Sequence, residues 1–203
     1  MVKYKFWDIV ALFYTRFMRK NDASFDSICR ETAPFLKPNM RVLEIGCGTG
    51  QITQHLVHKT AEWIATDFSP EMVRITANTV THPHLTCVVE DATCLSFRND
   101  AFDAVIIANV LHIIPEPDKA LREIQRVLKT DGLLIAPTFV FQTERKPLML
   151  WFMECIGFEI HSKWTASEFE NYIVQNKFDI VKSAIHSAKP LPELNLIAKK
   201  ITI

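Results

Sequence analysis

Three of the chain's five glycines, Gly46, Gly48 and Gly50, fall within five residues. They directly follow the predicted buried strand 41–45 and precede a segment of helical character. Glycine lets the backbone turn sharply and lets a ligand approach where a Cβ atom would collide. The unpaired N–H groups at the start of the following helix would face such a ligand. The spacing therefore predicts a ligand-binding loop, and the alternative is a tight strand-to-helix turn without a ligand.

A carboxylate at the end of the next predicted strand narrows the choice of ligand. Asp67 follows Gly50 by seventeen residues and could accept hydrogen bonds from both hydroxyls of a ribose. No Arg or Lys follows it directly, which disfavours the 2′-phosphate of NADP. A dinucleotide fingerprint would place a third glycine at position 51, where this chain has Gln51. These residues argue against a nicotinamide-dependent oxidoreductase.

The string VLEIGCGTG, residues 42–50, resembles motif I of the class I S-adenosylmethionine-dependent methyltransferases. Residues 67–72 and 90–92 resemble later segments of the same family. Residues 102–112 resemble motif IV of its small-molecule members, which are related to the ubiquinone and menaquinone C-methyltransferases. The segment that ends in LLIAP, residues 133–137, continues the resemblance, so the similar motifs span about residues 40 to 140.

The resemblance implies S-adenosylmethionine as the cofactor and assigns its contacts. It places the glycine loop around the methionine part, an acid on the ribose, and the residues after the second and third strands against the adenine. The cofactor-binding residues that it implies are Glu44, Gly46, Cys47, Gly48, Gly50, Gln51, Asp67, Phe68, Met72, Asp91, Ala92 and Asn109.

Two residues are candidates for a catalytic role. His112 follows the fourth predicted strand, at the carboxyl edge where α/β sheets bind ligands, and could serve as a general base. The alternative is a structural histidine in the pocket wall. Residues 1–20 resemble the N-terminal lid of related methyltransferases, in which an equivalent of Tyr14 approaches the cofactor or acceptor. A helix packed on the sheet and a helix at a membrane surface are the other interpretations.

The stretch 139–164 is rich in aromatic residues, among them Trp151, and follows the fifth predicted strand. We expect it to build an apolar acceptor pocket together with the N-terminal helix. Core packing is the competing explanation, since aromatic residues are more often buried in a core.

Short apolar strands alternate with helical patterns from residue 40 onward. Runs that are apolar on both faces suit a parallel sheet covered by helices on each side. Strands are expected at 41–45, 62–67, 85–89, 102–108, 133–138, 180–185 and 194–201. Helices are expected at 51–59, from Pro70 with Ser69 as N-cap, at 118–129 with Gly132 as the terminating residue, and from Thr165 or Ser167.

The expected fold is α/β. It is a doubly wound, mostly parallel, seven-stranded sheet of the Rossmann-like methyltransferase type with an N-terminal helical lid. We expect one domain over residues 1–203. It would comprise a lid (1–39), a cofactor-binding core (40–141), and an acceptor-side insertion with the C-terminal strands (142–203).

Composition argues against several function classes. Basic and acidic residues are equal in number, 23 each, which gives no electrostatic case for binding nucleic acid. The five cysteines form no CxxC pair, so neither a disulfide framework nor a metal site is predicted. No apolar run reaches the length of a membrane-spanning helix, and a signal peptide pattern is missing. We expect a cytoplasmic protein without stable membrane insertion.

The predicted function is methyl transfer from S-adenosylmethionine to a small, apolar acceptor molecule. The alternative is a catalytically silent S-adenosylmethionine-binding domain that acts as the partner of an active subunit. The residues favour no particular oligomeric state.

Overall fold

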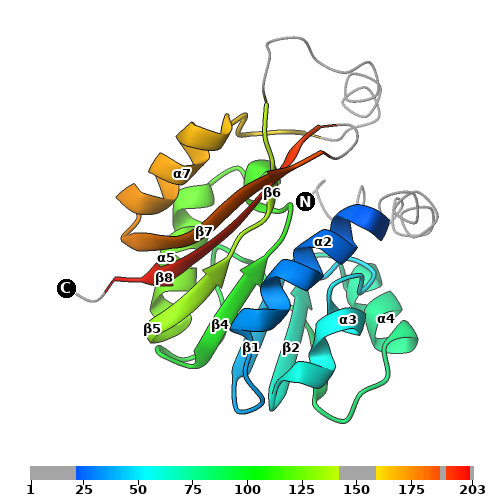
Figure 1. Cartoon of the computed structure of the whole chain (residues 1–203). Helices are drawn as coiled ribbons and strands as arrows, with labels where there is room; N and C mark the ends of the chain where they lie inside the picture. The colour runs from blue at the N-terminus through cyan, green and yellow to red at the C-terminus, as the bar shows by residue number, and fades with distance from the viewer. Residues whose placement is uncertain (1–21, 142–158, 188–190, 202–203) are drawn as a thin grey trace.

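The computed structural model describes residues 22–141, 159–187 and 191–201 (Figure 1). Its centre is an eight-stranded sheet with the order β3-β2-β1-β4-β5-β8-β6, in which β7 pairs with β8. The strands are β1 (Arg41–Ile45), β2 (Glu62–Asp67), β3 (Leu85–Val89), β4 (Phe102–Ile107), β5 (Leu128–Ile135), β6 (Thr138–Phe139), β7 (Phe178–His186) and β8 (Glu193–Lys200). The α-helices are α2 (Asp22–Thr32), α3 (Thr53–Leu56), α4 (Pro70–Thr79), α5 (Pro117–Val127) and α7 (Ala166–Gln175).

Strand β1 lies at the middle of the parallel part of the sheet. It pairs in parallel with β2 on one side and with β4 on the other. The chain therefore passes outward to β3 in one direction and to β5 in the other, which is the doubly wound arrangement that the sequence predicted. Strands β7 and β8 add antiparallel pairings at the far edge.

The sheet has eight strands where seven were expected, because the last parallel strand is divided. Strand β5 ends at Ile135, and the two-residue β6 resumes at Thr138 beyond Pro137. Proline has no backbone N–H to donate to a neighbouring strand. Both pieces pair with β8, so the division leaves the strand order unchanged.

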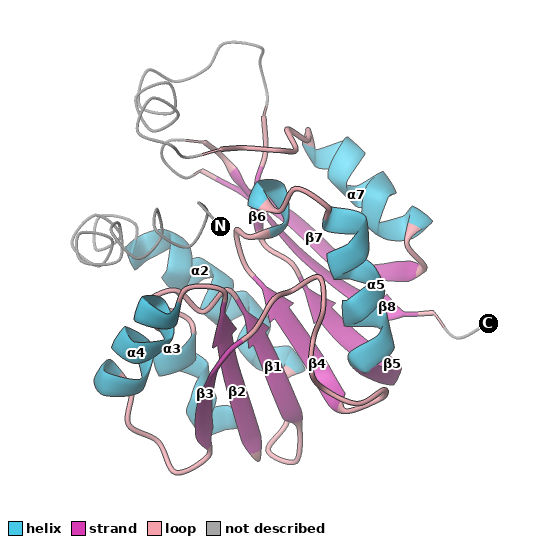
Figure 2. Ribbon diagram, turned by 180° about the vertical axis from the view of Figure 1, so that it is seen from behind, coloured by secondary structure: helices cyan, strands magenta, loops and turns pink. Residues whose placement is uncertain are grey.

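Helices cover both faces of the sheet. Figures 1 and 2 show α2 and α3 on one face and α5 and α7 on the other. Successive residues of β1 are buried on opposite faces of the sheet. Val42 packs in the same core as Ile28 of α2, and Leu43 packs in the opposite core with Ile124 of α5. Residues buried on both sides explain why these strands read as nearly continuous apolar runs.

The predicted caps of two helices are confirmed, and the predicted end of the helix at 118–129 is wrong. Ser69 caps α4, since its side chain accepts a hydrogen bond from Met72 N, and Thr165 caps α7 with a complete capping box. Gly132 was expected to end the helix before the fifth strand. Helix α5 instead ends at Val127, and Gly132 lies inside β5. Leu128 is fully buried and pairs with Phe102 of β4, so burial in the sheet fixes the helix end before the glycine is reached.

Another helix is shorter than expected. The predicted helix 51–59 is the short α3 followed by a 3-10 turn, η3 (Val57–Lys59).

The N-terminal segment is described from residue 22 onward, so most of the expected lid, including Tyr14, lies outside the described residues. Helix α2 also contacts the antiparallel strands of the sheet. Its Glu31 accepts a hydrogen bond from Asn195 of β8 at 2.7 Å and contacts His186 of β7 at 2.9 Å. Within the described ranges no helix is long and apolar enough to cross a membrane.

Candidate functional site

A cavity of about 310 Å³ opens at the carboxyl ends of the parallel strands. It lies where the chain order reverses between β1 and β4, the switch point at which open α/β sheets bind ligands. Residues that follow β1, β2, β3 and β4 all contribute to its wall. The lining residues are Ile45, Gly46, Gly48, Asp67, Phe68, Met72, Glu90, Asp91, Ala92, Thr93, Ala108, Asn109, Val110, Ile113, Ile114, Pro115 and Glu116.

The glycine loop makes the floor of the cavity. Gly46 has a φ angle of +73°, a left-handed conformation that glycine adopts without strain. A Cβ atom added there would lie 2.2 Å from Cγ2 of Val110, a contact no real side chain makes. The loops after β1 and β4 can therefore meet only because Gly46 has no side chain.

The Asp67 carboxylate joins the second strand to this loop. Its Oδ2 accepts a hydrogen bond from Gly48 N at 2.9 Å, and its Oδ1 accepts one from Ser69 N at 2.9 Å. Both oxygens are thus fixed in orientation at the cavity wall. A carboxylate has about four lone-pair sites, so this one can still accept hydrogen bonds from a ligand.

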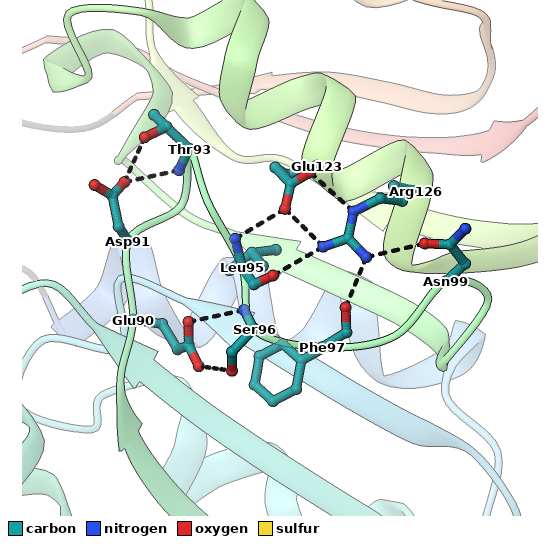
Figure 3. A network of polar contacts seen from close by, with 9 residues as sticks. All are labelled: Glu90, Asp91, Thr93, Leu95, Ser96, Phe97, Asn99, Glu123 and Arg126. Carbon is teal, nitrogen blue, oxygen red and sulfur yellow. Dashed lines mark hydrogen bonds and ion pairs between the residues drawn. The ribbon is translucent and has the colours of Figure 1, made fainter.

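The loop after β3 brings two further acids to the cavity. Oδ1 of Asp91 accepts hydrogen bonds from the backbone N–H and the hydroxyl of Thr93, at 2.8 and 2.7 Å. Glu90 accepts hydrogen bonds from the backbone and side chain of Ser96. Figure 3 shows Asp91 beside Thr93 and Glu90 beside Ser96 in this loop.

Arg126 of α5 holds the rest of this loop in place (Figure 3). Its guanidinium donates to the carbonyl of Leu95 at 2.9 Å and to that of Phe97 at 2.6 Å. Glu123, one turn earlier on α5, accepts from both Arg126 and Leu95 N. The hydrogen bonds from Arg126 hold the pKa of Glu123 below its ordinary value, which keeps the bracing pair ionised. Helix α5 therefore fixes the loop that carries Glu90 and Asp91.

Asn109 follows β4 and also lies on the cavity wall. Its φ angle is +56°, and its backbone N donates to Pro137 O at 2.8 Å. The side-chain Nδ2 donates to Oε1 of Glu193 at 2.6 Å. The amide oxygen Oδ1 is buried and has no hydrogen-bond partner.

The sequence profile of a family described as a methyltransferase domain matches residues 43–136. That range contains the glycine loop, Asp67, the loop after β3 and Asn109. These residues form a class I methyltransferase domain.

Relatives of known name agree with this assignment. The chain is 35% identical over 106 residues to a demethylmenaquinone methyltransferase from Renibacterium salmoninarum, covering 52% of this chain and 44% of that protein. The chain thus spans about half the length of the curated relative it matches.

Two solved structures are similar in fold to most of this chain. One belongs to the complex between the Haloferax volcanii Trm112 methyltransferase activator and a candidate methyltransferase. It has a TM-score of 0.79 at 17% identity and covers 97% of this chain and 98% of that chain. The other is magnesium protoporphyrin IX methyltransferase from Synechocystis with bound S-adenosylhomocysteine. Its TM-score is 0.66 at 21% identity, over 89% of this chain and 83% of that chain.

S-adenosylmethionine is the cofactor of this domain type, and the charge of the methyltransferase cavity fits it. The wall contains Asp67, Glu90, Asp91 and Glu116, and none of the described lining residues is a lysine, an arginine or a histidine. S-adenosylmethionine carries a net positive charge, whereas a dinucleotide pyrophosphate is anionic. The acidic wall therefore favours the sulfonium cofactor over a nicotinamide dinucleotide.

The structure brings eight of the twelve implied cofactor residues together at the cavity. They are Gly46, Gly48, Asp67, Phe68, Met72, Asp91, Ala92 and Asn109. Gly50 has a φ angle of +88° and belongs to the turn, but it does not line the cavity. Gln51 also lies outside the cavity lining, and its side chain donates to Thr49 Oγ1 at 2.6 Å. Cys47 is buried in the core behind the loop, with its sulfur 3.7 Å from the Thr76 hydroxyl.

Glu44 was expected among the cofactor-binding residues and does not line the cavity. Alternation along β1 turns it to the face that α3 covers, where Oε2 accepts hydrogen bonds from Thr53 Oγ1 at 2.6 Å and Trp63 Nε1 at 2.8 Å. Burial raises the pKa of this carboxyl to about 7, with a further contribution from Asp67, while the two hydrogen bonds act in the opposite direction. Glu44 therefore fixes the strand before the glycine loop.

His112 lies on the 3-10 turn η4 (Leu111–Ile113), directly behind the cavity wall. Its ring is buried, contacts Thr138 Oγ1 at 3.3 Å and packs against Phe139. Burial lowers the pKa of the imidazole to about 4, so it is neutral near pH 7. Its carbonyl accepts hydrogen bonds from His161 N and Ser162 N, which fasten the wall to the segment before α7. This placement favours the structural interpretation over that of a general base.

Sequence reasoning missed three residues that shape the site, namely Glu123, Arg126 and Glu193. The aromatic stretch that was expected to bind the acceptor lies largely in residues 142–158, outside the described residues, and Trp151 with it.

A methyl group at position 46 should disrupt the cavity floor. In Gly46→Ala the new Cβ meets Val110 and the backbone is held at a φ angle that alanine disfavours. We expect a loss of about 1–3 kcal/mol in the free energy of unfolding, measured by urea denaturation. Val110→Ala in the same chain should recover part of that loss, because the collision is removed and the φ strain stays. Strictly additive effects of the two substitutions would contradict the contact.

Removing the arginine brace should free the loop after β3. In Arg126→Met we expect amide hydrogen exchange at Leu95 and Ser96 to accelerate by about tenfold or more, since opening the loop then breaks fewer hydrogen bonds. Arg74→Met is the matched control, because Arg74 forms an equivalent ion pair with Glu71 on α4 and does not touch the loop. Unchanged protection in Arg126→Met would show that the loop is held by other contacts.

The Glu44 carboxyl should make stability depend on pH. Its folded pKa of about 7 exceeds the ordinary value of 4.5, so the folded state binds more protons between these values. The stabilisation is complete below the lower value and is lost as the pH rises through about 7. Glu44→Gln keeps an acceptor oxygen for Thr53 and Trp63 but does not titrate. The free energy of unfolding of wild type minus that of Glu44→Gln should therefore fall across this window. Parallel pH profiles of the free energy of unfolding in wild type and Glu44→Gln would contradict the raised pKa of Glu44.

Proposed function

We propose that this methyltransferase transfers the methyl group of S-adenosylmethionine to a small, apolar acceptor. The observation that carries the proposal is the Asp67 carboxylate, fixed by Gly48 N and Ser69 N in an acidic cavity at the switch point of the sheet. When bound there, S-adenosylmethionine supplies a methyl carbon that its sulfonium makes electrophilic.

Each end of the cavity has side chains suited to one part of the cofactor. Asp67 would accept hydrogen bonds from the ribose hydroxyls. Phe68 and Met72 would flank the adenine, and the loop at Asp91 and Ala92 would bind its edge. On the other side, Gly46, Gly48 and Asn109 would surround the methionine part. Adenosine would thus lie toward β3, and the amino acid toward β4.

The main catalytic contribution of the chain would be positioning. Holding donor and acceptor in an attack geometry can lower a barrier by roughly 7–11 kcal/mol. The acceptor side of the cavity is apolar, since Val110, Ile113, Ile114 and Pro115 all line it. Such a wall excludes water from the transferring methyl group and suits an acceptor with an apolar surface. The similarity to a demethylmenaquinone methyltransferase supports the same class of acceptor.

A second candidate function is action together with a partner. The Haloferax volcanii structure is a complex that contains a protein named as a methyltransferase activator. The chain of that complex that matches this one resembles it in fold over nearly its full length. In that case the chain would bind S-adenosylmethionine without a partner, but would transfer the methyl group only in a complex with one.

The cofactor site can be tested by calorimetric titration with S-adenosylmethionine. We expect wild type to bind, and Asp67→Asn to bind about 10- to 100-fold more weakly, because it loses a charge-assisted acceptor and sets an amide nitrogen against a backbone N–H. Asp131→Asn is the matched control. Asp131 is exposed, pairs with Lys199 and also has a left-handed φ angle that asparagine tolerates.

Four results would bear on the proposal in different ways. Binding lost only in Asp67→Asn supports the assigned ribose site. Equal affinity of wild type and Asp67→Asn would place the cofactor elsewhere. No binding of S-adenosylmethionine or S-adenosylhomocysteine by folded wild type would overturn the proposed function. Binding without turnover over a panel of apolar acceptors would favour the partner-dependent alternative.

A further inference from the structure

The backbone of Asn109 is held in a fixed, uncommon conformation. A φ angle of +56° is left-handed, a region that asparagine occupies more readily than most residues. The backbone N–H donates to the carbonyl of Pro137 at 2.8 Å, which ties the end of β4 to the break between β5 and β6. The side chain therefore leaves the backbone at a defined point of the cavity wall.

Glu193 determines which way the Asn109 amide faces. Glu193 begins β8 and is only 1% exposed. A carboxylate only accepts hydrogen bonds, so the amide nitrogen must face it, and it does so at 2.6 Å. The reversed amide would set two acceptor oxygens against each other. The amide oxygen is thus forced to the side away from Glu193.

That oxygen is a buried acceptor without a partner. Oδ1 of Asn109 has no hydrogen bond, although the residue lines the cavity. A buried polar atom left without a partner is costly, so such atoms often mark a place where a ligand completes the site. Only a donor can satisfy this one. The nearby acids favour a donor that carries positive charge.

We propose that Glu193 is a positioning residue that turns the Asn109 oxygen toward a cationic N–H donor of the bound ligand. This inference rests on the proposed function, in which that donor is the ammonium group of the methionine part. Glu193 itself does not touch the ligand. Its effect passes through the orientation of one amide.

The experiment compares two ligands that differ only at this end. S-adenosylhomocysteine carries the ammonium group, whereas 5′-methylthioadenosine keeps the adenosine and the thioether and lacks the amino acid. Glu193→Gln is nearly isosteric, but glutamine can donate as well as accept, so it no longer fixes the amide. We expect Glu193→Gln to weaken the binding of S-adenosylhomocysteine about tenfold and the binding of 5′-methylthioadenosine less than about twofold.

Two further variants make the comparison decisive. Asn109→Gly removes the amide and suits the left-handed backbone. It should therefore also weaken the binding of S-adenosylhomocysteine more than that of 5′-methylthioadenosine. Asn195→Ala is the control, because Asn195 is buried on the same face of β8 and binds Glu31 of α2 instead. It should lower stability and leave the ratio of the two affinities unchanged.

Equal weakening of the binding of both ligands in Glu193→Gln would mean that Glu193 supports the whole cavity, and no weakening of either would mean that it has no part in binding. Either result would overturn the inference. If Glu193→Gln does not fold, the same criteria apply to Asn109→Gly. Failure of the wild type to bind either ligand would be a different result. It would contradict the proposed function rather than the role of Glu193.

Discussion

The Asp67 carboxylate is the contact on which the site depends. By accepting hydrogen bonds from Gly48 N and Ser69 N, it joins the loop after β1, the end of β2 and the start of α4. The ligand-facing loop and the helix that follows β2 are therefore positioned by the same group that would bind the ribose. This arrangement requires the left-handed glycine loop, because Gly46 must pass Val110 at a distance that no side chain allows.

Two distant side chains complete the site at its opposite ends. On the β3 side, Arg126 of α5 holds the loop that carries Glu90 and Asp91. On the β4 side, Glu193 of β8 orients Asn109. Each uses charge-assisted hydrogen bonds, which are stronger than neutral ones. These hydrogen bonds hold both ends of the cavity wall in place, as expected of a site whose catalytic contribution is positioning.

Local patterns in the sequence predicted the alternation of strands and helices, the helix cap at Ser69, a further cap at Thr165 or Ser167, and the glycine loop, because each depends on residues close together in the chain. The end of α5 was missed because the burial of Leu128 against β4, a contact between distant segments, overrides the glycine signal. Glu44 and His112 were placed at the site from their positions in motifs, yet strand alternation and burial turn both away from the cavity. Glu193 lies 84 residues from Asn109, so no local pattern points to it.

The most direct test of this account is a crystal structure of the protein soaked with S-adenosylhomocysteine. We predict the ribose hydroxyls on Asp67, the adenine between Phe68 and the loop at Asp91, and the ammonium group on the Asn109 oxygen. A ligand bound in the opposite direction, or outside the cavity at the ends of β1, β2 and β4, would contradict the central claim that this cavity is the cofactor site.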